Sequence, residues 1–174
     1  IQLLSNRQRR SYLADHTTNM ARLYRTWAEM DPDPVTGQNK MRLSAEYYEK
    51  ATQLSPHNAQ LFNEWGDVCR LMGDLDQALV RYQQALALDE QFAQTHFLIG
   101  DLYLSRQQWR EAVHSYQRAL ALDPGYARGW SILAICHSQL GEWQEAIGAS
   151  LKTLEVNPKD FVTLRNLASC YAQL

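Results

Sequence analysis

The sequence predicts an all-α protein, a solenoid built from antiparallel helix-turn-helix hairpins. Two observations lead to this fold class. Three consecutive blocks of 34 residues, 59–92, 93–126 and 127–160, align with one another without a gap. Within each block, apolar residues recur at helical spacing. The 174 residues are 45% apolar and 21% charged, which is usual for a globular protein. We therefore expect residues 1–174 to form a single domain.

Columns of small and apolar residues define the repeat. The small residues at block position 8 are Gly66, Gly100 and Ala134. The alanines at position 20 are Ala78, Ala112 and Ala146, and the leucines at position 28 are Leu86, Leu120 and Leu154. A glycine inside a helix costs about 1 kcal/mol relative to alanine, so it persists where a Cβ atom would clash. We expect position 8 of the first helix to face position 20 of the second.

Turn residues separate the two helices of each block. Gly73 and Gly141 lie between them in two of the blocks, and glycine suits the left-handed residue that ends a helix. Pro124 and Pro158 follow the second helix in the second and third blocks. Proline stops a helix, and the residue before it avoids helical backbone angles.

Residues 11–58 are predicted to form a degenerate repeat. Ser44 and Tyr48 lie 34 residues before Ala78 and Tyr82, so residues 40–58 correspond to a second helix. Ala21 would take the small position of the first helix. Between the two, residues 31–39 contain two prolines and show no apolar periodicity, which predicts an exposed inserted loop. A tolerated surface insertion is favoured over a hinge or a partner-binding loop.

Residues 161–174 are predicted to be the first helix of a further repeat or a terminal capping helix. Leu164, Leu167 and Tyr171 form an apolar stripe on this helix. The stripe is covered either by a continuation of the natural protein or by another copy. The first is favoured because the chain opens with Ile1 and not with methionine. An uncapped solenoid end is poorly soluble, so self-association through residues 161–174 is the second expectation.

With these columns, the repeat resembles the tetratricopeptide repeat (TPR) family, whose 34-residue pattern is W-x2-L-G-x2-Y followed by alanine, an aromatic residue, alanine and proline. The second block supplies Ile99, Gly100, Tyr103, Ala112, Tyr116, Ala119 and Pro124. The third supplies Trp130, Leu133, Ala134, Ala146 and Pro158. Departures are Glu90 for the proline, Ser150 for the aromatic residue and Thr153 for the alanine after it. The resemblance implies a right-handed superhelix whose first helices line a concave face.

No motif for catalysis, a cofactor or a metal is found in the sequence. A nucleophile elbow, a P-loop, a dinucleotide fingerprint and H-E-x-x-H are all missing, and no histidine is paired at i,i+3 or i,i+4 with another ligand in a metal-binding pattern. His96 and His137 are interpreted as structural, and His57 as a solvated turn residue. The net charge of −2 gives no electrostatic reason to bind nucleic acid. No apolar run approaches the ~20 residues that span a bilayer, so we expect no membrane insertion.

The three cysteines, Cys69, Cys136 and Cys170, are predicted to be free thiols in first helices. Packed neighbouring helices lie about 8–10 Å apart, and a disulfide needs Cα atoms within about 7 Å. Free thiols favour a reducing compartment, the cytoplasm, although a soluble domain of a membrane protein is an alternative.

The resemblance implies a binding surface at positions 2, 5, 9 and 12 of the first helices. The residues we select there are Asn63, Asp67, Arg70, Gln94, Phe97, Asp101, Leu104, Arg128, Ser131 and Arg165. We hypothesise that charge runs from acidic at Asp67 and Asp101 to basic at Arg128 and Arg165. Such a gradient would orient a bound peptide. Phe97 and Leu104 would then form an apolar anchor. The alternative is a solvated inner face without a ligand.

The favoured function is a non-catalytic scaffold that binds a protein or peptide segment along this concave face. The carboxylate clamp that some family members use for chaperone C-termini needs a lysine that is missing here, where Asn63 is followed by Asp67. An asparagine ladder is missing too, because that column reads Glu64, Leu98, Ile132 and Asn166. The alternative is a TPR appendage of a larger bacterial enzyme, such as an O-linked GlcNAc-type glycosyltransferase or a membrane O-antigen ligase or polymerase.

Overall fold

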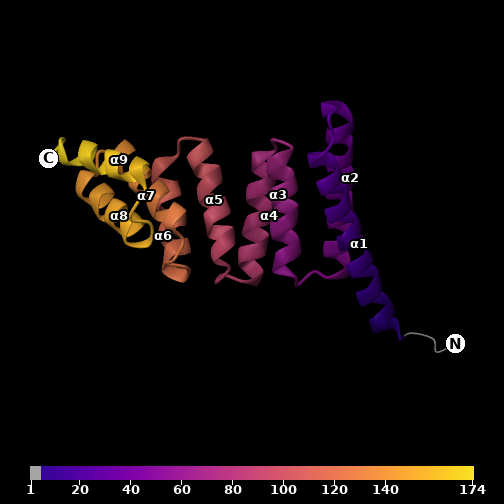
Figure 1. Ribbon diagram of the computed structural model, residues 1–174. Coiled ribbons are helices and arrows are strands. Elements are labelled where there is room, and N and C mark those ends of the chain that lie inside the picture. The colour runs from indigo at the N-terminus through magenta and orange to yellow at the C-terminus, as the bar shows by residue number, and fades with distance from the viewer. Residues whose placement is uncertain (1–4) are drawn as a thin grey trace. The chain divides into compact units, whose positions relative to one another are not determined.

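The computed structural model describes residues 5–174, and these residues form helices and connecting turns without a strand. Figure 1 shows the helices in chain order. Their bounds are α1 Asn6–Glu29, α2 Pro34–Leu54, α3 Ala59–Leu71, α4 Leu75–Leu88, α5 Ala93–Ser105, α6 Trp109–Leu122, α7 Ala127–Gln139, α8 Trp143–Val156 and α9 Phe161–Tyr171. The predicted pairs of helices in the three blocks are therefore confirmed.

The chain divides into two compact units, Ile1–Glu90 and Gln91–Leu174. In the first unit, α1 pairs with α2 and α3 pairs with α4, and α2 packs on α3. In the second unit, α5 pairs with α6 and α7 pairs with α8, while α6 contacts α7 and α9 packs on α8. Each unit is thus a short stack of helical hairpins in chain order.

The turns inside the α3–α4, α5–α6 and α7–α8 hairpins use a left-handed residue. Gly73 and Gly141 have φ angles of 82° and 74°, as expected for glycine at the end of a first helix. In the second block this place is taken by Gln107, with φ of 57°. The turn geometry is therefore kept even where the residue is not glycine.

Position 8 is small for a reason that differs from our expectation. A Cβ atom on Gly66 would lie 2.5 Å from Cε1 of Tyr82, and one on Gly100 would lie 3.0 Å from the ring of Tyr116. The ring at position 24 of the second helix, and not the alanine at position 20, is therefore the neighbour that excludes a side chain. The third repeat pairs Ala134 with Ser150, which is buried and whose Oγ has no hydrogen-bond partner within residues 5–174.

The predicted loop at residues 31–39 is wrong beyond residue 33, because α2 already begins at Pro34. Asp33 caps the helix by accepting hydrogen bonds from the backbone N–H groups of Val35 and Thr36. Proline is favoured in the first turn, where its missing N–H has no partner to lose. The extra residues therefore lengthen α1 and α2 to 24 and 21 residues, against 13 and 14 for α3 and α4. In Figure 1 the α1–α2 turn reaches past the α3–α4 turn.

Two residues that the alignment places at small positions of the first hairpin lie against each other. Ala21 and Ser44 are both fully buried. The Ser44 hydroxyl donates a hydrogen bond to the carbonyl oxygen of Ala21 at 2.7 Å. The two predicted small positions therefore meet across α1 and α2.

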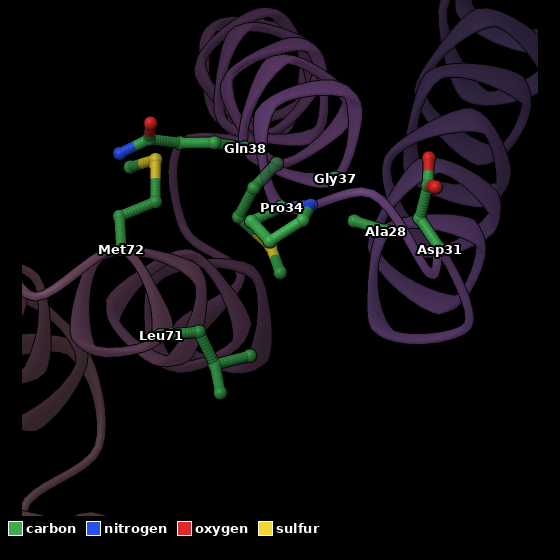
Figure 2. A pocket seen from close by; sticks show the side chains of 8 residues that line it. Ala28, Asp31, Pro34, Gly37, Gln38, Leu71 and Met72 are labelled. Carbon is green, nitrogen blue, oxygen red and sulfur yellow. The ribbon is translucent and has the colours of Figure 1, made fainter.

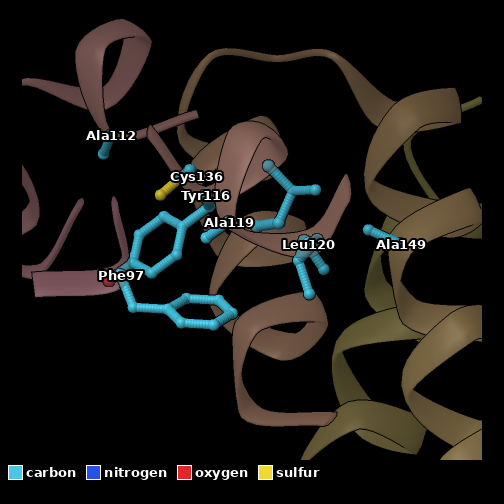
Figure 3. Packing of buried hydrophobic residues seen from close by; sticks show 9 residues of the cluster. Phe97, Ala112, Tyr116, Ala119, Leu120, Cys136 and Ala149 are labelled. Carbon is cyan, nitrogen blue, oxygen red and sulfur yellow. The ribbon is translucent and has the colours of Figure 1, made fainter. Parts of the chain in front are cut away.

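The core of the second unit lies between its successive hairpins. Figure 3 shows the rings of Phe97 and Tyr116 packed close to Leu120 and Cys136. A smaller cluster joins Ala146 and Ile147 of α8 to Cys170 of α9, with Leu167 packed against it. Leu164 and Tyr171 of the predicted stripe are exposed.

Candidate functional site

Buried tyrosine hydroxyls hold two carboxylates of the first helices in place. The Tyr82 hydroxyl of α4 donates to Oδ1 of Asp67 on α3 at 2.8 Å, and the Tyr116 hydroxyl of α6 donates to Oδ1 of Asp101 on α5. Burial and then the neighbouring carboxylate raise the pKa of each tyrosine. The hydroxyls therefore stay protonated, and each pair fixes an acidic group at position 9.

A third tyrosine takes part in a larger network in the first unit. Glu64 of α3 accepts two hydrogen bonds from Arg22 of α1, at 2.7 and 2.8 Å. Tyr48 of α2 and Gln60 of α3 also donate to it, at 2.9 and 2.8 Å. Burial would raise the pKa of Glu64, but Arg22 and these donors outweigh it, and the pKa is lowered. The charged network joins three helices.

The tyrosine and the acid are replaced together in the third repeat. Position 9 is Ile135 and position 24 is Ser150, so neither half of the pair remains. A small cavity of about 160 Å³ lies next to Ile135, between α7 and α9. Its wall is formed by Ile135, Ser138, Gln139, Trp143, Asn166, Ser169 and Cys170. The surface there offers neutral amide and hydroxyl groups instead of a carboxylate.

The selected first-helix residues differ in how accessible they are. Gln94, Arg128 and Arg165 are exposed. The residues that are partly exposed are Asp67, Arg70, Asp101, Leu104 and Ser131. Arg70 lies 3.5 Å from Oδ1 of Asp67, and the Ser131 hydroxyl lies 3.5 Å from that of Thr163. Asn63, in contrast, is 1% exposed and belongs to the interior of its hairpin.

Phe97 is not the accessible anchor that we expected. Its side chain is only 9% exposed, and its ring centroid lies 4.3 Å from that of Tyr126. A Cβ atom on Gly129 would lie 2.7 Å from Cε1 of Phe97, so the ring occupies space that this glycine leaves free. Leu104 packs against the same cluster. Phe97 therefore belongs to the core of the second unit, whereas Leu104 is partly exposed.

The charged residues of the predicted gradient are divided between the units. Asp67 and Arg70 lie in the first unit, where they contact each other. Asp101, Arg128 and Arg165 lie on α5, α7 and α9 of the second unit. Within the second unit the order of charge along the chain is thus acidic, basic and basic.

Sequence reasoning missed the tyrosines that position the acids. A usable signal was present, because an aspartate at position 9 and a tyrosine at position 24 occur together in two blocks and are lost together in the third. The Arg22–Glu64 pair had no such signal, since Glu64 is at position 6 and its partner lies in the degenerate repeat.

One histidine and the three cysteines are buried. His137 is buried, and its Nδ1 lies 2.7 Å from a carboxylate oxygen of Glu142. The three cysteines are free and buried, and burial raises the pKa of Cys69 and Cys136 to about 11. Among residues 5–174, no group of three or more histidine, cysteine or acidic side chains is arranged to hold a metal. None of the helices in this range is both long and apolar enough to cross a membrane.

Helical hairpins that follow one another in each unit, two of which carry a tyrosine of the second helix bonded to an aspartate of the first, define a helical-repeat protein. One family profile, described as TPR repeat, matches residues 66–105, and another, described as tetratricopeptide repeat, matches residues 97–161. The chain belongs to the tetratricopeptide repeat family. No curated protein sequence matches it significantly.

Solved structures share the fold at low sequence identity. A crystal structure of MamA protein gives a TM-score of 0.80 at 19% identity, covering 94% of this chain and 83% of that chain. YrrB, described as a TPR protein with an unusual peptide-binding site, gives a TM-score of 0.69 at 19% identity. The match covers 86% of this chain and 75% of that chain. The first TPR of Spaghetti (RPAP3) bound to the HSP90 peptide SRMEEVD gives a TM-score of 0.61 at 20% identity. The match covers 66% of this chain and 91% of that chain.

Proposed function

We propose that this chain is a non-catalytic scaffold that binds a peptide segment of a partner protein along its first helices. One observation carries the proposal. Buried tyrosines hold Asp67 and Asp101 at equivalent positions of successive repeats, which prepares fixed anionic groups before any ligand arrives. A preorganised group loses less conformational entropy on binding than a mobile one. The family, the peptide-binding site named for YrrB and the peptide bound to the first TPR of RPAP3 support the same reading.

In the second unit, the charges favour one direction of the bound segment. Asp101 on α5 would attract a basic residue, while Arg128 on α7 and Arg165 on α9 would attract acidic residues. Complementary charges of this kind contribute to orientation and specificity more than to affinity. The small cavity next to Ile135 would take an uncharged polar side chain of the segment, from a residue that lies between its basic and its acidic residues. The bound segment would therefore have a basic end and an acidic end.

The test uses two fluorescein-labelled peptides of equal composition and opposite order, Lys-Lys-Gly-Ser-Gly-Ser-Glu-Glu and its reverse. Fluorescence anisotropy with the full chain should show tighter binding of one order. The variant with both Arg128→Glu and Arg165→Glu should lose that preference. Asp101→Asn should weaken it while keeping an acceptor for Tyr116. Lys152→Glu, on the exposed face of α8, is the matched control.

Equal binding of the two peptides by the wild-type chain would contradict the proposed direction. An unchanged preference in the double arginine variant would contradict the role of the first helices. The appendage to a larger bacterial enzyme stays a prediction that the flanking sequence of the parent gene would decide.

A further inference from the structure

A second cavity lies in the first unit, at the end of the α1–α2 hairpin. Its volume is about 390 Å³, and its wall is formed by Ala28, Asp31, Pro34, Gly37, Gln38, Met41, Leu71 and Met72. Figure 2 shows Leu71 and Met72 on one side, Ala28 and Asp31 on the other, and Pro34 between them. None of these residues belongs to the surface described above for peptide binding.

The cavity exists because the first hairpin is longer than its neighbour. α3 ends at Leu71 and is capped at Met72, after which the chain turns at Gly73 into α4. The last turns of α1 and the first turns of α2 therefore extend beyond α3. Gly37 keeps these two helices close, because a Cβ atom there would lie 3.3 Å from the carbonyl oxygen of Ala28.

The wall is mainly apolar and adaptable. Leu71 is 44% exposed although it is a large aliphatic residue, and Met41 and Met72 contribute flexible thioether side chains. Methionine adjusts its shape to different apolar partners, which is why it is common on binding surfaces. The volume falls within the range of small ligand pockets, about 300–1,000 Å³. One apolar side chain of a partner would fit this cavity.

Two carboxylates, those of Asp33 and Asp74, closely precede or follow wall residues in the sequence. In the wall, Asp31 accepts hydrogen bonds from Lys40 and Thr36, and the pair with Lys40 neutralises both charges. Asp33 directly precedes Pro34, and Asp74 comes two residues after Met72. Both cap helices through backbone N–H groups, and within residues 5–174 neither has an ion pair with a cationic side chain. A basic residue next to the inserted apolar side chain would be attracted to these carboxylates.

We propose that this cavity binds a partner segment in which a leucine, methionine or phenylalanine is flanked by lysine or arginine. The apolar side chain enters between Met41, Met72 and Leu71, and the cationic residue lies near Asp33 and Asp74. The site is independent of the first-helix surface, so a partner could occupy both surfaces at once. The cavity also differs from the first-helix surface in specificity, because the cavity buries an apolar residue of the partner and the first-helix surface does not.

The test uses nuclear magnetic resonance of the full chain with ¹³C-labelled methionine methyl groups. The chain has four methionines, of which Met41 and Met72 line the cavity and Met20 does not. The probes are the peptides acetyl-Gly-Lys-Leu-Lys-Gly-amide and acetyl-Gly-Glu-Leu-Glu-Gly-amide. The lysine peptide should shift the Met41 and Met72 signals in a saturable way and leave Met20 unchanged, and the glutamate peptide should bind at least about fivefold more weakly.

Matched variants separate the cavity from the charge. Gln38→Trp should abolish the shifts by filling the opening, whereas Asn39→Trp, at an exposed neighbouring position outside the wall, should keep them. The variant with both Asp33→Asn and Asp74→Asn should reduce the preference for the lysine peptide, and because asparagine caps helices as well as aspartate, the fold should persist. Asp160→Asn, a cap in the second unit, is the control.

Three results would overturn the proposal. The first is that neither methionine responds to the lysine peptide. The second is that the lysine and glutamate peptides bind equally well. The third is that Met41 and Met72 shift with protein concentration in the absence of peptide, which would identify a second copy of the chain as the occupant.

Discussion

Two glycines of this chain show how much the effect of one methyl group depends on its surroundings. Gly66 sits against the ring of Tyr82, which is fully buried and cannot move aside. Gly148 lies in the interior of α8 with open space where its Cβ would be. Both are helical glycines, so the intrinsic gain in helix propensity on changing either to alanine is the same. The packing around each glycine therefore decides whether the change to alanine raises or lowers the free energy of unfolding.

We expect Gly66→Ala to lower the free energy of unfolding by about 1–3 kcal/mol, because the new Cβ overpacks the contact with Tyr82. Gly148→Ala should raise it by about 0.5–1 kcal/mol, since only backbone entropy and propensity change. Urea denaturation followed by circular dichroism measures both. If both variants shift the midpoint in the same direction, the role given to Tyr82 is wrong.

The sequence predicted the small positions and their period correctly but not the contact that requires them. Spacing places Gly66 on the side of its helix that faces the partner helix. It does not say which partner side chain is largest at the point of approach. Phe97 illustrates the same limit, because its side chain packs into space left by Gly129, a residue of the next repeat. The direction of the side chain at position 5 therefore depends on the size of a residue in another repeat.

At the scale of secondary structure, the first hairpin departs most from the sequence prediction. Two prolines and an interrupted apolar pattern indicated a loop over residues 31–39. The same residues contain a good helix start, with Asp33 as the cap and Pro34 in the first turn. The signals for a loop and for a capped helix overlap, and the contact of Gly37 with the end of α1 favours the helix. The later repeats lacked this ambiguity because their turns carry a glycine or a short polar linker.

Asp31 makes the α1–α2 turn sensitive to acid. Hydrogen bonds from Lys40, Thr36 and the backbone of Asp33 lower the pKa of Asp31 to about 2, from a usual value near 3.8. A lowered pKa in the folded state means that the ionised form stabilises the fold. This contribution is complete above about pH 4 and is lost as the pH falls toward 2.

We therefore expect Asp31→Asn to destabilise the chain at pH 7 and to have little effect at pH 2. The difference between the urea midpoints of the wild type and the variant, measured from pH 7 to pH 2, should shrink mainly below pH 4. Asp15→Asn, at an exposed position in α1, is the control. A difference that stays constant over this range would show that the Asp31 carboxylate contributes through shape and not through charge.

At the scale of the molecule, α9 presents an apolar face that its unit does not cover. Phe161 is 78% exposed, and Leu164 and Tyr171 are 41% and 56% exposed. The equivalents of Ala168 at position 8, Gly66, Gly100 and Ala134, are all buried against the second helix of their own hairpin, whereas Ala168 is exposed. In this chain the surface of α9 that would contact such a second helix is therefore open to solvent.

We expect the chain of residues 1–174 to self-associate through this face. Light scattering should give an apparent mass that rises with protein concentration. The double variant with Leu164→Lys and Tyr171→Lys should remain monomeric at the same concentrations. The control, Leu151→Lys, changes an exposed leucine of α8. A concentration-independent mass for the wild-type chain would contradict this expectation.

The tyrosine–carboxylate pairs have a consequence for how firmly the two helices of a hairpin keep their register. Such a bond crosses the middle of α3/α4 and of α5/α6, but in α7/α8 the corresponding side chains are Ile135 and Ser150. The two helices of each of the first two hairpins are therefore joined by a directed side-chain hydrogen bond, whereas at this place the helices of the third hairpin are joined by packing alone. Sliding of one helix along the other would break this hydrogen bond in the first two hairpins, and in the third it would meet no such directional restraint.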